Sequence, residues 1–117
     1  MMATIATKEL LVLFLIDAEP GIKSIDKLLK IFDNANFPSK ISTSLNYLLE
    51  NEYIIVSKRH PNNSAIAYKS TKEGKLILIQ YFDKTDIVKF INNLDNPHFL
   101  LEVTEVYIIK ANKADSL

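Results

Sequence analysis

Two runs rich in β-branched and aromatic residues flank a turn sequence near the middle of the chain. They are "YIIVSKR" (53–59) and "AIAYKS" (65–70), and the intervening "HPNNS" contains proline and asparagine, which favour turns. The pattern predicts two antiparallel strands joined by a short loop. Because an isolated two-stranded ribbon is only marginally stable in water, we expect it to pack on helices, either through the alternate residues or through Ile54, Val56 and Ile66.

Two helices are predicted in the N-terminal third. The segment "TKELLVLFLIDAE" begins at Thr7, a favourable N-cap, and is apolar on nearly all sides, which indicates a buried helix that Pro20-Gly21 ends. A second helix is predicted to follow the cap Ser24. Its apolar residues recur at i, i+3, i+4 and i+7, so its expected buried face consists of Ile25, Leu28, Leu29 and Phe32.

A third helix is predicted directly before the first strand, with its start at Pro38 or Ser39. Its apolar residues form one stripe, which consists of Ile41, Leu45, Leu48 and Leu49. At 100° per residue, the opposite face is short and polar. That face carries Ser39, Thr43, Asn46 and Glu50, flanked by Lys40 and Tyr47.

Three further helical segments are predicted after the ribbon. The pattern Ser70-x-x-Glu73 is typical of a capping box, with Thr71 as a competing cap, and it leads into "KLILIQYF". The segment "DKTDIVKFINNL" predicts a short helix that begins near Asp83 and Asp86, where carboxylates favour a helix start. The last segment has Asn96 as its expected cap and Pro97 as its first residue. Residues 102–110 are β-branched enough for a strand, but their spacing favours helix.

The order of three helices, a ribbon and a helix is that of a winged helix-turn-helix domain. The sequence around the ribbon also resembles winged-helix regulators related to MarR and PadR. These often show L-x-x-L-x-x-x-G-Y/L-I at the end of the third helix, then a basic wing, then Y-x-L-T-x-x-G. Residues 45–54 and "YKSTKEG" (68–74) match this framework, although Glu52 replaces its glycine and Ser70 replaces an apolar residue.

The resemblance implies a mainly α fold with a small β-hairpin, in the α+β class. It covers residues 7–82, so we expect a winged-helix domain over residues 1–82 and a C-terminal helical extension over residues 83–117. The extension is expected either to pack on the domain or to form a dimer interface.

A winged helix that binds double-stranded DNA places its third helix in the major groove and cationic wing residues near phosphates or the minor groove. Arg59 is the only arginine in the chain, and its planar, weakly hydrated guanidinium suits a narrow minor groove. The alternative is that Arg59 is a solvated loop charge. The expected DNA-binding residues are Ser39, Lys40, Thr43, Asn46 and Tyr47 on the helix, and Lys58, Arg59, His60 and Lys69 on the wing.

Composition argues against several other functions. The chain has no cysteine, and its only two histidines, His60 and His98, are far apart in sequence, so we expect no metal site. Catalytic motifs and a glycine-rich phosphate loop are missing, so we expect no enzymatic activity and no cofactor. The apolar run at residues 10–16 is much shorter than the roughly 20 residues of a membrane span. We therefore expect a soluble, cytoplasmic protein.

Charge is balanced overall but uneven along the chain. The sequence has 14 cationic and 14 acidic residues, yet residues 39–75 hold six cations and three carboxylates. This is a weak signal for DNA, which two copies of the chain on one duplex would strengthen. The rival function is a winged-helix module that binds proteins, favoured by the zero net charge, by Glu50 and Glu52, and by the lone arginine.

Apolar segments are dense after residue 75. "LILIQYF", "IVKFI", "FLL" and "VYII" lie close together in sequence. Exposed apolar patches of this kind usually mark an interface, so we expect a homodimer formed through the C-terminal helices. The alternative is that these helices complete one monomeric core. The sequence does not indicate an effector ligand.

Overall fold

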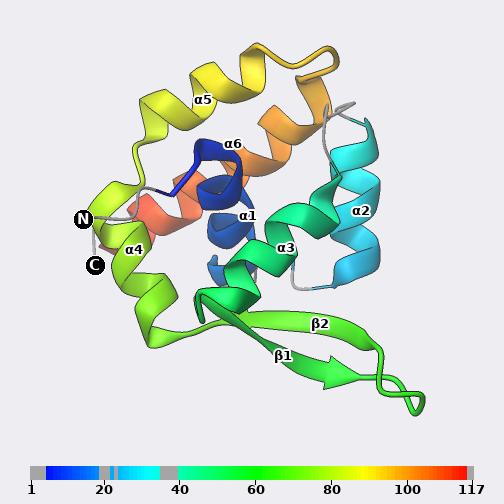
Figure 1. Ribbon diagram of the computed structural model, residues 1–117. Coiled ribbons are helices and arrows are strands. Elements are labelled where there is room, and N and C mark those ends of the chain that lie inside the picture. The colour runs from blue at the N-terminus through cyan, green and yellow to red at the C-terminus, as the bar shows by residue number, and fades with distance from the viewer. Residues whose placement is uncertain (1–4, 19–21, 23, 35–39, 116–117) are drawn as a thin grey trace.

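The computed structural model describes residues 5–18, 22, 24–34 and 40–115. Within these residues the chain forms six helices and one antiparallel hairpin (Figure 1). The elements are α1 (Thr7–Asp17), α2 (Ile25–Asn34), α3 (Ile41–Glu50), β1 (Ile54–Arg59), β2 (Ala65–Ser70), α4 (Lys72–Tyr81), α5 (Lys84–Asn92) and α6 (His98–Asp115). The predicted fold class, a mainly α chain with a winged-helix-like layout, is confirmed.

Helix α1 lies at the centre of the structure. Every residue from Leu10 to Ile16 is buried, because α3, α4, α5 and β2 pack around the helix (Figure 1). The absence of a polar face on α1 is therefore what its position requires. The predicted cap is wrong: Thr7 is the first helical residue, and Ala6 occupies the N-cap without a side-chain hydrogen bond. The predicted stop at Pro20-Gly21 lies outside the described residues.

Helix α2 begins directly after Ser24, as predicted, but its buried face differs from the predicted one. Leu28 and Phe32 are buried, and Ile31 joins them, whereas Leu29 is exposed. The reason is that α6 packs against α2, so the buried face turns toward Ile31 and away from Leu29.

The hairpin packs on the helices through one face, as predicted. Ile54 and Tyr68 are buried, and Val56 and Ile66 are partly buried. Ser24, which lies directly before α2, also forms an isolated antiparallel bridge with Ala67 of β2. This bridge holds the start of α2 against the hairpin.

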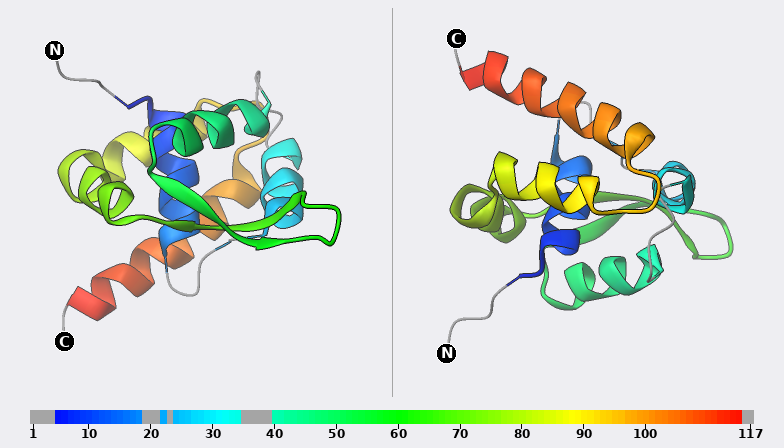
Figure 2. Two further views of the ribbon diagram at one scale, coloured as in Figure 1. Left: turned by 60° about the horizontal axis from the view of Figure 1, so that its bottom comes forward. Right: turned by 90° about the horizontal axis from the view of Figure 1, so that it is seen from above.

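The C-terminal helices belong to the same core as α1. Ile87 and Ile91 of α5 and Leu100 and Ile108 of α6 are buried in it. Residues 102–110 are helical, as favoured from their spacing. In Figure 2 the C-terminal part of α6 extends away from the other helices.

Of the caps predicted after the hairpin, the competing cap Thr71 and the carboxylate Asp83 are confirmed, whereas Ser70 and Asn96 do not cap their helices. Thr71 caps α4 by accepting a hydrogen bond from the Gly74 amide at 3.1 Å. Asp83 caps α5 through the amide of Asp86, also at 3.1 Å. Helix α6, however, begins at His98, and the side chain of Asn96 donates to the Asn34 carbonyl at the end of α2 at 2.8 Å.

Candidate nucleic-acid interface

Helix α3 and strand β1 diverge from a shared corner at residues 51–53, like the two arms of a V (Figure 1). The N-terminal end of α3 and the hairpin tip form the open end. The tip projects beyond the helices in each view in Figures 1 and 2. Any surface made jointly by α3 and the hairpin therefore depends on how rigidly this corner is held.

The corner begins with a Schellman motif at the end of α3. The Glu52 amide donates to the Leu49 carbonyl at 3.0 Å, and the Tyr53 amide donates to the Leu48 carbonyl at 2.9 Å. Such a motif needs a left-handed residue after the C-cap Asn51, and Glu52 has a φ of 62°. This is the position at which the sequence pattern led us to expect glycine. Glutamate adopts this left-handed conformation only at a cost in backbone strain.

Replacing Glu52 by glycine is expected to raise the free energy of unfolding by about 0.5–1 kcal/mol, because glycine adopts a positive φ without steric strain. Chemical denaturation monitored by circular dichroism measures the change. The matched control is Glu50→Gly, which removes the same charge from the last helical residue of α3 and is expected to lower stability by about 0.5–1 kcal/mol. Equal losses in the two variants would show that φ at Glu52 is not strained.

The start of α4 closes the corner from the other side. The Thr71 amide donates to the Tyr53 carbonyl at 3.0 Å, and the Thr71 hydroxyl donates to the Glu52 carbonyl at 2.6 Å while it caps Gly74. A Cβ built on Gly74 would lie 2.2 Å from the Tyr53 carbonyl oxygen. The T-x-x-G pattern thus has a physical role here. Thr71 forms hydrogen bonds with the corner, and Gly74, which has no Cβ, lets α4 approach the corner closely.

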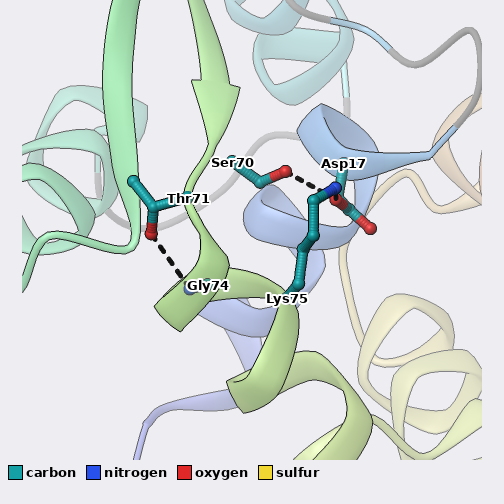
Figure 3. Close-up of polar contacts among 5 residues, drawn as sticks. All are labelled: Asp17, Ser70, Thr71, Gly74 and Lys75. Carbon is teal, nitrogen blue, oxygen red and sulfur yellow. Dashed lines mark hydrogen bonds and ion pairs between the residues drawn. The ribbon is translucent and has the colours of Figure 1, made fainter.

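Asp17, at the end of α1, anchors the adjoining segment (Figure 3). Its carboxylate accepts a hydrogen bond from the Ser70 hydroxyl at 2.5 Å and forms an ion pair with the Lys75 ammonium at 2.6 Å. Ser70 therefore bonds to α1 instead of acting as the predicted capping residue. Asp17 was not among the predicted site residues; a carboxylate directly after the apolar run at residues 10–16 was the available signal.

Helix α3 presents Thr43 and Asn46 to solvent, as predicted, and its expected apolar stripe faces the core. The predicted start is wrong, because the helix begins at Ile41. Lys40 is the extended N-cap residue, with φ −72° and ψ 144°, so its exposed side chain leaves from the end of the helix rather than from its face. Ser39 lies outside the described residues.

Lys8 of α1 contacts the N-terminal end of α3. Its ammonium donates to the Lys40 carbonyl at 3.1 Å, and burial lowers the pKa of Lys8. This contact, which the sequence analysis missed, fixes the backbone at the point where the side chain of Lys40 projects. No periodicity or motif indicated it, because the two residues are 32 positions apart.

Tyr47 is partly buried rather than fully available on the polar face of α3. Its ring lies 6.5 Å from that of Tyr53, between centroids, with the planes inclined by 56°. Burial raises the pKa of Tyr47, and the nearby Tyr53 and Glu9 add to the effect. The ring of Tyr47 thus lies beside that of Tyr53 at the corner, and its phenol is a hydrogen-bond donor.

A bulge in β1 changes which way the wing lysine points. Val56 pairs with Tyr68, but Lys58 pairs with Ala67, so the register shifts between these pairs. Without the shift Lys58 would be opposite Ile66, on the inner face. Because alternate residues share a face, pairing with Ala67 places Lys58 on the same face of the hairpin as Lys69. The run "IIVSKR", which fails to alternate, was a signal of this bulge.

Arg59 has a structural contact at the hairpin tip. Its Nη1 donates to the carbonyl of Asn63 at 2.9 Å, and Asn63 has a left-handed φ of 71°. The guanidinium therefore holds the turn, using one of its five N–H donors. The adjacent His60 is exposed, and its backbone bonds close the loop with Ser64 and Asn63. Both interpretations of Arg59 left open by the sequence are compatible with this contact, since the other donors have no partner among the described residues.

Charge is segregated along the V. Lys40 lies at the open end of the α3 arm, and Lys58 and Arg59 lie near the open end of the hairpin arm. Glu50 and Glu52, both exposed, lie at the corner. Lys69 does not join the open end, because it pairs with Ile55 near the corner. Apart from Lys69, the exposed cations of the two arms thus lie toward the open end, whereas both carboxylates lie at the corner.

An open apolar hollow of about 240 Å³ lies between α2 and the start of α6. It is lined by Ile22, Lys27, Lys30, Ile31 and Phe99. Among the described residues, no three histidine, aspartate or glutamate side chains gather as a metal site requires.

The helices in the described part of the chain are too short or too polar to cross a membrane.

Comparison with known proteins returns no similar chain: no family model, curated protein or solved structure matches this sequence.

Proposed function

We propose that this protein is a DNA-binding transcriptional regulator of the winged-helix class, related to the MarR and PadR regulators, and not an enzyme. The observation that carries the proposal is the segregation of charge along the V. Cations at the open end of both arms provide phosphate contacts, and the carboxylates at the corner remain away from a duplex that enters from the open end.

The proposed roles follow from exposure and chemistry. Asn46 and Thr43 project from the exposed face of α3, where an amide pairs with an adenine edge and a hydroxyl pairs with a base or a phosphate. Lys40 contacts a phosphate from the end of the helix. The hairpin tip brings Lys58 and Arg59 to the backbone or the minor groove, and the bond to Asn63 restrains the guanidinium before binding.

Substituting Lys58 or Arg59 with alanine is expected to weaken DNA binding about threefold to tenfold and to make the slope of log K against log salt shallower by about 0.9 for each lost phosphate contact. The measurement is fluorescence anisotropy of a labelled duplex of mixed sequence, titrated at about 50 and about 200 mM salt. Arg59→Lys keeps the charge, so it is expected to preserve most of the salt slope.

The matched control is Lys89→Ala, which removes one exposed charge from α5, on the opposite side of the molecule from the hairpin (Figure 1). It is expected to leave binding unchanged. A result in which all three alanine variants weaken binding equally would mean that the protein binds through its overall charge and not through the wing.

The second candidate function is a winged-helix module that binds a protein. It is favoured by Ile55, which is 44% exposed on the outer face of the hairpin beside Lys69, and by the carboxylates at the corner. The same titration separates the two functions. No binding to the duplex at the lower salt concentration would reject the DNA-binding proposal and favour this one.

We infer further that the protein acts as a homodimer, through a surface that includes its C-terminal helices. Large hydrophobic side chains are exposed on α4 and α6: Leu76, Ile79, Phe99, Val106 and Ile109. Apolar exposure concentrated on two helices is typical of an interface. Two protomers would present two copies of the basic V to one duplex.

A further inference from the structure

Two exposed helix faces of this chain have the same spacing and opposite charge. The α4 face carries Lys72, Leu76 and Ile79, and the α6 face carries Glu102, Val106 and Ile109. Each set follows i, i+4 and i+7, so each forms one stripe along its helix. Ile79 is 82% exposed and the other three apolar side chains are 49–54% exposed, so neither face is covered within the chain.

We propose that these faces bind each other between two copies of the chain. The α4 face of one protomer packs in parallel against the α6 face of its partner, and a two-fold axis repeats the contact with the roles exchanged. This inference rests on the homodimer inferred above and specifies its interface.

Parallel packing places apolar side chains opposite apolar side chains and brings the opposite charges together. Lys72 faces the partner's Glu102, Leu76 faces the partner's Val106, and Ile79 faces the partner's Ile109 in a single register. In both stripes the first and last residues are seven positions apart, which is about 10 Å of helix, so the three contacts align without distortion. The apolar pairs supply the driving force, and the charge pair selects the register.

The other pairings of these faces are less favourable. An antiparallel arrangement places Lys72 against the partner's Ile109 and Glu102 against the partner's Ile79, so each charge loses water without a partner. Parallel pairing of either face with its own copy opposes two lysines or two glutamates. Only the parallel pairing of α4 with α6 satisfies every position of the two stripes.

The position of the two faces fits a two-fold dimer. Helix α4 lies away from the hairpin tip, and α6 runs from beside α2 toward the same side of the molecule as α4, in Figures 1 and 2. One partner can therefore engage both faces at once and leave both hairpins free. Lys72 is also the first residue of α4, where the helix dipole disfavours a cation, and the partner's Glu102 would offset that cost.

The first test is the dimer dissociation constant measured by sedimentation equilibrium on the full chain. Ile79→Asp is expected to raise it a hundredfold or more, because a carboxylate would be buried among apolar side chains. Lys72→Glu and Glu102→Lys are each expected to raise it roughly tenfold, since each creates two like-charge contacts per dimer. The double variant is expected to return close to the original value. All of these positions are exposed, so circular dichroism is expected to show the original fold.

The second test mixes the Lys72→Glu protein with the Glu102→Lys protein. Both contacts of the mixed dimer then pair opposite charges, because the substituted side chains face each other in one contact and the original pair forms the other. The mixture is expected to dimerise more tightly than either protein alone. A pairing of each face with its own copy predicts instead that each single reversal leaves the constant unchanged, because one like-charge pair replaces another.

The outcomes separate this interface from the proposals on which it rests. A chain that is monomeric at every concentration overturns both the homodimer and this interface. A dimer that is insensitive to all three positions overturns the interface alone. Neither measurement contains DNA, so both are independent of whether the wing binds a duplex.

Discussion

Replacing Gly74 by alanine is expected to lower the free energy of unfolding by about 3 kcal/mol. Helix propensity alone predicts the opposite sign, since alanine in place of a helical glycine gains about 1 kcal/mol. The added Cβ would lie 2.2 Å from the carbonyl oxygen of Tyr53 and 3.3 Å from Cδ1 of Leu13, however. The oxygen belongs to the backbone and accepts a hydrogen bond from the Thr71 amide, so it cannot move away without breaking that hydrogen bond. The steric term therefore outweighs propensity.

Urea denaturation monitored by circular dichroism measures this change. The control is Glu73→Ala, at the neighbouring and exposed position of α4, which is expected to change stability by less than about 0.5 kcal/mol. A Gly74→Ala protein as stable as the original would mean that α4 is not in close contact with the corner. The close approach of α4 to Tyr53 would then lose its role in fixing α3 relative to the hairpin.

Local patterns were sufficient to predict the elements of this fold. The hairpin follows from two β-branched runs around a turn sequence, and the helices follow from periodicity over ten or more residues. Element boundaries were less accurate, because distant groups compete for capping side chains. Ser70 bonds to Asp17 and Asn96 bonds to Asn34, so neither caps the helix that its local pattern indicates. A single sequence read locally contains no sign of these partners.

The candidate site was predictable as a set of positions but not as a geometry. Exposure of Thr43 and Asn46 follows directly from the stripe opposite them. The orientation of Lys58 depends on a shift in register, and the restraint on Arg59 depends on a left-handed asparagine in the loop. Both are properties of the hairpin as a whole. Residue types alone therefore predicted which side chains α3 and the hairpin carry. They did not predict where the charges of these side chains lie relative to one another.

Truncating Ile91 to alanine is expected to destabilise the whole chain by about 3 kcal/mol in a single cooperative transition. Ile91 is completely buried in α5, and α5 packs against α1, the helix at the centre of the core. The substitution removes apolar atoms from a site that is closed on all sides, so a cavity adds to the lost transfer free energy. The C-terminal helices would thus support the winged-helix part of the chain directly.

The matched control is Ile55→Ala, the same substitution at a position of β1 that is 44% exposed, for which a loss of about 1 kcal/mol or less is expected. Denaturation should be followed in a Tyr107→Phe background, which removes the tyrosine of α6, by two probes. They are far-ultraviolet circular dichroism, which reports helices throughout the chain, and tyrosine fluorescence, to which Tyr47 and Tyr53 at the corner contribute. Coincident transitions at a lower denaturant concentration are the expected result. The contrary result is that α5 and α6 unfold first, with the tyrosine signal unchanged. The extension would then be a separate unit docked on the domain, and contact with α5 would not explain why α1 has no polar face.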